Sequence, residues 1–184
     1  RLPLTEDLPK RPVSVYGRSK LMTEQMLEDV SRAHGLRFAA LRYFNAAGAD
    51  PDGEIGEEHE PETHLIPNAI KAAIGLGGPM KLFGADYPTP DGTCLRDYVH
   101  VTDLAADRLN EGSGNLQLNL GTGEGRTVLQ VLKAVETATG RPVPVTIAPR
   151  RPGDAVALYA DATKVRETLG WTPRLSDIDT IVSS

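Results

Sequence analysis

The chain has 184 residues, of which 40% are hydrophobic and 24% are charged, as in ordinary globular proteins. Its net charge of −5, without a Lys/Arg-rich run, argues against a nucleic-acid partner. Cys94 is the only cysteine, which excludes an intramolecular disulfide and suits a reducing, cytoplasmic compartment, and no apolar run is long enough for a membrane partner.

The first half of the chain predicts a helix, a strand, a loop, a second helix and a short strand. Ser14 can cap a helix that runs to about His34, with apolar residues at helical spacing and Gly35 as its end. Residues 36–44 are typical of a buried strand, and a long loop rich in acidic residues, Gly and Pro follows. We expect the second helix at about 65–74, closed by Gly75, and the short strand at 81–84.

The second half alternates strands and helices. Strands are expected at 96–101, at 116–120 before a glycine turn, at 143–148 and at 155–160. Helices are expected after Thr102 or Asp103, after Thr127, from Asp161 to about 169, and from Ser176. This alternation predicts an α/β protein.

Tyr16 precedes Lys20 by four residues, so the two side chains share one face at the start of the first helix. The pattern alone is weak, because a buried hydrogen-bonded pair explains it as well as acid/base chemistry does. The helix leads into a strand, an arrangement found where open α/β sheets bind ligands. A phenol is a poor base at neutral pH, and a nearby ammonium stabilises the phenolate.

Three other patterns have both a structural and a functional interpretation. The glycines of GTGEG, residues 121–125, fit neither the dinucleotide nor the P-loop spacing, which favours a plain turn. In PRRPGD, residues 149–154, the arginines suit either a solvated turn or a phosphate, and Arg96 suits either a phosphate or a surface pair with Asp97. The four histidines lack metal-ligand spacing, so no metal site is predicted.

Several stretches occur in the order seen in UDP-glucose 4-epimerases of the extended short-chain dehydrogenase/reductase family: YGRSK, LRYFNAAGADPDG, FGADYPTPDGTCLRDYVHVTDLA, LNLGTG and APRRPGD. The chain resembles that family over almost its whole length. Sugar-nucleotide dehydratases of the same superfamily share the Tyr-x-x-x-Lys pattern, but they typically have Asn-x-Tyr-Gly-Pro after the strand. This chain has Asn45-Ala46-Ala47-Gly48 there.

The resemblance implies an NAD-dependent enzyme that interconverts UDP-glucose and UDP-galactose by oxidation and re-reduction at C4 of the hexose. Tyr16 would take the O4 proton, and Lys20 would bind the nicotinamide ribose. Tyr43 and Phe44 would line the nicotinamide side. Two alternatives remain: an epimerase for a UDP-pentose or a UDP-uronate, and a non-catalytic UDP-sugar-binding domain.

The resemblance also implies a UDP-sugar site. Its residues would be Asn45, His64, Leu65, Lys81, Leu82, Phe83, Arg96, Arg151, Asp154 and Leu158. Arg96 and Arg151 would neutralise the diphosphate, Asp154 would bind the uridine ribose, and Leu158 would form a wall beside the sugar. His64 stands where some members have Asn.

The fold implied is the end of a Rossmann-type doubly wound parallel sheet plus a smaller α/β substrate domain, with the N-terminal Rossmann half absent. Residues 1–60 would belong to the first domain and 61–184 mainly to the second, with 97–121 returning to the first. We therefore expect residues 1–184 alone to be inactive and the full-length protein to be a homodimer. The helix expected after Thr102 is about two turns shorter than the resemblance implies, which suggests that residues are missing at a splice within DLAADR, residues 103–108.

Overall fold

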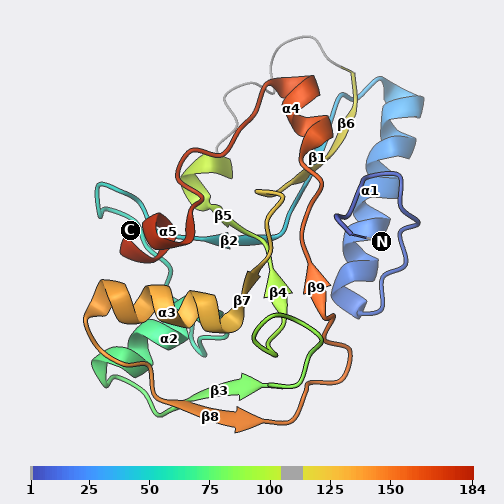
Figure 1. The fold of residues 1–184 in the computed structure, drawn as a ribbon. Coiled ribbons are helices and arrows are strands. Elements are labelled where there is room, and N and C mark those ends of the chain that lie inside the picture. Colours follow the sequence, from blue (N-terminus) through green and yellow to red (C-terminus); the bar gives the residue numbers. More distant parts are fainter. Residues whose placement is uncertain (1, 105–113) are drawn as a thin grey trace.

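The computed structural model describes residues 2–104 and 114–184 (Figure 1). Its sheets are built mainly from short parallel strand pairs. The pairs are β1 (Ala39–Tyr43) with β6 (Leu116–Leu120), β2 (Asn45–Ala47) with β5 (Tyr98–His100), and β3 (Met80–Phe83) with β8 (Val145–Ala148). In a three-stranded sheet, β4 (Leu95–Arg96) lies between antiparallel β7 (Arg126–Thr127) and parallel β9 (Ala157–Leu158). Parallel pairing combined with helices confirms the α/β class.

The caps of the three longest helices described agree with the sequence. In α1 (Val15–His34) the Ser14 hydroxyl accepts a hydrogen bond from the Gly17 N–H, and Gly35 ends the helix in the left-handed region at φ 71°. Helix α2 (Leu65–Ile74) ends at Gly75 in the same way. Helix α3 (Val128–Thr139) begins with a capping box between Thr127 and Gln130. These ends follow from local hydrogen bonds, which the sequence encodes directly.

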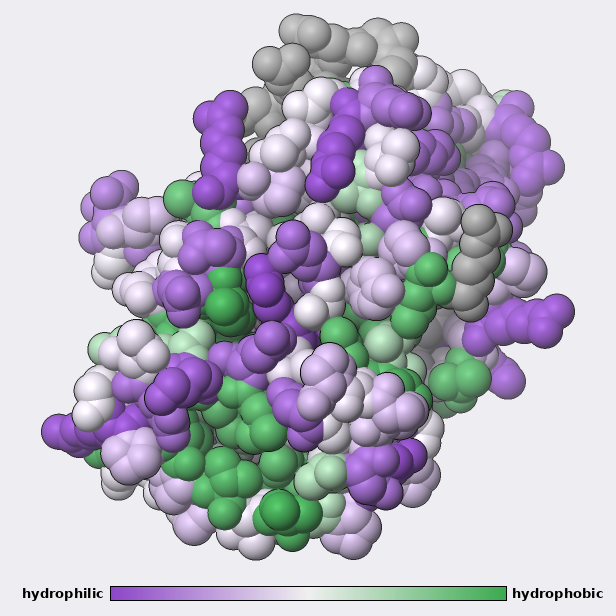
Figure 2. All heavy atoms as spheres, viewed as in Figure 1, coloured by the Kyte–Doolittle hydropathy of each residue, from purple (hydrophilic) through white to green (hydrophobic). Residues whose placement is uncertain are grey.

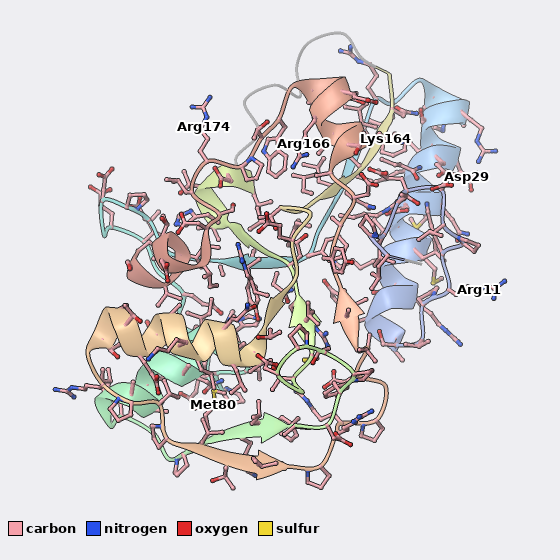
Figure 3. The ribbon with its side chains drawn as sticks, in the orientation of Figure 1. Arg11, Asp29, Met80, Lys164, Arg166 and Arg174 are labelled. Atoms are coloured by element: carbon pink, nitrogen blue, oxygen red, sulfur yellow. The ribbon has the colours of Figure 1, made fainter. Side chains whose placement is uncertain are left out.

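The core has two clusters of buried residues. In the first, α3 packs against both α2 and α5 (Ile178–Ser183), and buried Tyr98 of β5 joins them. In the second, Leu118 and Leu120 of β6 pack against α4 (Thr163–Leu169) and Trp171. Lys164 and Arg166 of α4 (labelled in Figure 3) donate to the carbonyls of Gln117 and Thr122, which fixes this helix beside β6 and its turn. The division into two domains stays a prediction.

Figure 2 shows hydrophobic side chains gathered in the lower part of this view, over α3, β3 and β8, whereas the upper part around α4 is mainly hydrophilic. Strand β8 contributes Ile147, which is 69% exposed, and Val145, which is 37% exposed. Strand β8 therefore presents an apolar outer face.

Several predicted boundaries are wrong. The strand expected at 96–101 is broken at Asp97 into β4 and β5, because the Asp97 carboxylate turns inward to bind backbone N–H groups. The strand at 155–160 is reduced to the two residues of β9. Helix α5 begins at Ile178 with Asp177 as its cap, because the Ser176 hydroxyl donates to the Asp103 carboxylate instead.

Two further cap predictions need correction. The cap residue of α4 is Ala162, although the predicted Asp161 does accept a hydrogen bond from the Thr163 N–H at 2.9 Å. After β5, residues Val101–Leu104 form one 3-10 turn. The remainder of the helix expected there, and most of the suspected splice, lie outside the described residues.

The apolar face of α1 is not covered by the described part of the chain. Met22 and Met26 are 62% and 66% exposed, and no residue of α1 is buried. Strand β1, expected to be buried, is only half-buried, with Tyr43 exposed. Helical and strand periodicity predicts which side chains share a face, but it does not show what packs against that face.

Candidate functional site

The Tyr16–Lys20 pair lies on the exposed first turns of α1. Tyr16 is 71% exposed, and the Lys20 Nζ lies 5.3 Å from the centroid of the tyrosine ring, in a cation–π arrangement. Neither the Tyr16 hydroxyl nor the Lys20 ammonium has a hydrogen-bond partner among residues 2–104 and 114–184. The alternative of a buried hydrogen-bonded pair is therefore wrong for the described chain, and both groups are available to a ligand.

Helix α1 is fixed to β1 by a charge network that sequence reasoning missed. The Arg42 Nε and Nη2 donate to the two carboxylate oxygens of Glu24 at 2.7 and 2.8 Å, and the Lys10 Nζ donates to the same carboxylate at 2.6 Å. The Arg42 hydrogen bond holds the pKa of Glu24 below its usual value, with Lys10 adding to the effect. Because Arg42 directly precedes Tyr43, this bidentate pair sets the helix carrying Tyr16 relative to the end of β1.

Tyr43 and Phe44 line a cavity of about 380 Å³ at the carboxyl end of β1. Residues 4–6, residues 8–10 and Asn119 form much of its remaining wall. Tyr16 and Lys20 do not line this cavity, so the described chain brings together only two of the four predicted cofactor residues. The end of a parallel strand is nonetheless where α/β sheets usually bind ligands.

The two predicted diphosphate arginines converge on one carboxylate. The Arg96 Nη2 lies 3.7 Å from one Asp154 oxygen, and the Arg151 Nε lies 3.3 Å from the other. The Arg151 guanidinium also stacks on the ring of Phe83 at 4.3 Å. Leu158 is the register partner of Arg96 across β4 and β9, so these five predicted substrate residues gather at one place.

The two arginines are held differently. The Arg96 side chain is 16% exposed, and its Nη1 donates to the carbonyls of Leu95 and Ala155 at 2.7 and 2.9 Å. The Arg151 side chain is 61% exposed, with Asp154 as its ion-pair partner. Arg96 is thus fixed in place by the backbone, whereas Arg151 can turn toward a ligand.

The other predicted substrate residues have mixed positions. Leu82 is buried in the core, whereas Lys81 is exposed, as strand alternation requires. Leu65 packs at the edge of the first core cluster. The Asn45 Nδ2 donates to the Asp97 carbonyl at 2.7 Å, so that amide group is already engaged by the backbone.

His64 occupies the N-cap position of α2, but its side chain does not cap the helix. Its Nδ1 contacts the Glu57 carboxylate, and the Nδ1 of His59 lies 2.8 Å from the same oxygen. Glu62 completes a group of four possible metal ligands. The prediction of no metal site considered only the spacing of histidines with each other and with cysteine, and it did not consider the neighbouring glutamates Glu57 and Glu62.

Asp97 explains the glycine turn after β6. This carboxylate is fully buried and accepts hydrogen bonds from the N–H groups of Thr122, Gly123 and Ala160 and from the Thr122 hydroxyl, at 2.7 to 3.3 Å. A Cβ at Gly121 would collide with it. The turn therefore binds an anion of the protein itself, and the proposed surface pair of Asp97 with Arg96 is wrong.

Parallel strand pairs, an exposed Tyr–Lys pair and a carboxylate between two arginines define an α/β protein with a candidate site for an anionic ligand. No helix of the described residues is long and apolar enough to cross a membrane. The chain belongs to the family of GDP-mannose 4,6 dehydratase, whose family model matches residues 1–183.

Similar proteins include UDP-glucose 4-epimerases. The protein of Azospirillum brasilense is 50% identical over 100% of this chain and 54% of its own length, and that of Streptococcus mutans is 46% identical over 100% and 57%. The crystal structure of the Brucella ovis UDP-glucose 4-epimerase in complex with NAD superposes with a TM-score of 0.94, at 52% identity over 99% of this chain and 58% of that one. The chain thus spans a little over half the length of these relatives.

A solved complex bears on the ligand. The Bifidobacterium longum UDP-glucose 4-epimerase in complex with NAD+ and UDP superposes with a TM-score of 0.91, at 44% identity over 100% of this chain and 57% of that one. The resemblance to UDP-glucose 4-epimerases seen in the sequence motifs is therefore confirmed.

Proposed function

We propose that the full-length protein containing this chain interconverts UDP-glucose and UDP-galactose. The observation that carries the proposal is the convergence of Arg96 and Arg151 on Asp154, beside the ring of Phe83. Two guanidinium groups can neutralise a diphosphate, the carboxylate can accept hydrogen bonds from ribose hydroxyls, and the ring can border a base. The relatives' names support UDP-glucose as the sugar nucleotide.

The residues that would hold NAD fit its nicotinamide end. Tyr16 and Lys20 are exposed and have no hydrogen-bond partner within the described residues, and Tyr43 and Phe44 border a cavity at the end of β1. When bound, NAD would supply the hydride acceptor and donor at C4 of the hexose. A phenolate stabilised by an adjacent ammonium is suited to accept the proton of the sugar O4, and the ammonium can also donate to ribose hydroxyls.

The roles of this chain's residues then follow. Tyr16 would take the O4 proton and return it, and Lys20 would favour the phenolate by its charge. The Glu24–Arg42 pair would keep Tyr16 at a fixed distance from Tyr43 and Phe44. Arg96 and Arg151 would bind the diphosphate in either sugar configuration, because the diphosphate is the same in UDP-glucose and UDP-galactose.

The test is to incubate the purified full-length protein with UDP-galactose and to follow the formation of UDP-glucose. Product formation without added reductant or oxidant is the expected result. UDP binding without any product would instead support the non-catalytic alternative. Product from a UDP-pentose or a UDP-uronate, but not from UDP-galactose, would move the proposal to another sugar.

A further inference from the structure

The segment between β2 and α2 gathers two histidines and two glutamates. They lie outside the site formed by Arg96, Arg151 and Asp154, called the arginine site below. We propose that Glu57, His59, Glu62 and His64 form a binding site for one divalent transition-metal ion, with Zn²⁺ as the best match. One ligand atom from each residue lies within 4.8 Å of the ligand atoms of the other three. Few side-chain rotations would therefore bring all four onto one ion.

The donor set selects the class of metal. Two imidazole nitrogens and two carboxylate oxygens suit the four-coordinate geometry of Zn²⁺. Mg²⁺ and Ca²⁺ prefer sets made of oxygen alone, and imidazole favours Zn²⁺, Cu²⁺ and Ni²⁺. The centroids of the two imidazole rings lie 5.2 Å apart and their planes are inclined at 64°, so the rings do not stack face to face.

The local backbone already holds part of the site in place. The Glu62 Oε1 accepts hydrogen bonds from the N–H groups of Thr63 and His64 at 2.7 and 2.8 Å. These two hydrogen bonds fix the Glu62 carboxylate at the start of α2. The Nδ1 of His64 lies 3.6 Å from the same oxygen.

The position of His64 gives a separate argument. Ser, Thr, Asp and Asn are preferred at a helix N-cap because their side chains accept a backbone N–H. His64 stands at the N-cap of α2 without making this bond, and its ring turns toward Glu57 and His59. The start of a helix disfavours a bare cation, but Glu57 and Glu62 offset a doubly charged ion there.

The metal site should also affect the binding of UDP at the arginine site. Only this effect on UDP binding rests on the proposed function. His64 and Leu65 are among the residues assigned to the UDP-sugar. An ion that binds the His64 ring withdraws it from the sugar nucleotide and fixes the start of α2. Zn²⁺ should therefore weaken UDP binding.

The experiment is calorimetric titration of the tag-free, chelator-treated full-length protein with ZnCl₂. We expect one ion per chain, and His59→Ala and His64→Ala should each weaken binding at least about 10-fold, since even outer partners of metal ligands change affinity by that factor. Glu57→Gln should do the same. His34→Ala is the matched control, because this exposed histidine at the end of α1 lies outside the group.

Three outcomes would overturn the site. They are no stoichiometric binding of Zn²⁺, equal affinity in the wild type and in the His59→Ala/His64→Ala double variant, and an equal loss in His34→Ala. Circular dichroism establishes that each variant is folded, and the exposure of both rings favours this. The titration contains no nucleotide, so its failure is distinct from a failure of UDP binding.

Discussion

Removing the Arg151 side chain tests the proposed diphosphate-binding site most directly. Arg151→Ala deletes a guanidinium that pairs with Asp154 and stacks on Phe83, and it leaves Arg96 in place. If both arginines bind the diphosphate of UDP, this change should weaken UDP binding without unfolding the protein. The side chain is 61% exposed, so its removal leaves no buried cavity.

The expected size follows from the exposure. Hydrogen bonds to charged groups contribute roughly 1.5–3 kcal/mol, and solvent screening places a largely exposed arginine at the lower end of this range. A loss of about 1.5 kcal/mol corresponds to an increase in Kd of about 10-fold. Part of the loss is offset because UDP no longer competes with the Arg151–Asp154 pair.

Calorimetry with UDP measures this change, and the neighbouring arginine supplies the control. Arg150 donates to Asp86 at 2.7 Å and stacks on Tyr87 at 4.2 Å, away from Asp154. Arg150→Ala should change the Kd less than about 2-fold, because exposed pairs contribute little. An unchanged Kd in Arg151→Ala, or an equal loss in both variants, would show that the diphosphate binds elsewhere.

Four further predictions follow from the same structure. Tyr16→Phe should lower turnover of UDP-galactose at least about 100-fold with unchanged UDP binding, and near-normal turnover would end its role as a base. Asp97→Ala should lower the free energy of unfolding, measured by urea titration, by about 3 kcal/mol, because it leaves buried N–H groups unsatisfied. Asp29→Ala is the control and should change this free energy little, because Asp29 is exposed. Because the pKa of Glu24 is lowered in the folded protein, its contribution to stability is present above its unfolded pKa of about 4.5 and is lost as pH falls through the folded pKa. Between neutral pH and about pH 3, the melting temperature should therefore fall more in the wild type than in Glu24→Gln. If half-buried Leu158 forms a wall beside the sugar, UDP-N-acetylglucosamine should be used less efficiently than UDP-glucose, and equal kcat/KM values would show that this wall is not restrictive.

Local signals in the sequence were sufficient for most helices and strands. Ser14 and Thr127 begin their helices, and Gly35 ends its helix, through hydrogen bonds to residues within four positions along the chain. The position of Asp97 could not be predicted in this way, because its partners Thr122 and Ala160 are 25 and 63 residues away. An Asp inside a predicted strand indicates a break or a buried partner, but it does not identify that partner.

The candidate site shows the same limit at a larger scale. Residue chemistry alone allowed Arg96 and Arg151 either to be solvated or to bind an anionic ligand, and only the motif resemblance selected the second role. Their convergence depends on β4 pairing with β9, which brings Arg96 beside Leu158 and places Asp154 within reach of both guanidinium groups. The local pattern of a strand indicates which of its faces is buried, but it does not identify a partner strand so far away in the sequence. The fold therefore brings the two arginines together. If they bind the diphosphate, a variant that weakens the β4–β9 pairing should weaken UDP binding even if it leaves both arginines unchanged.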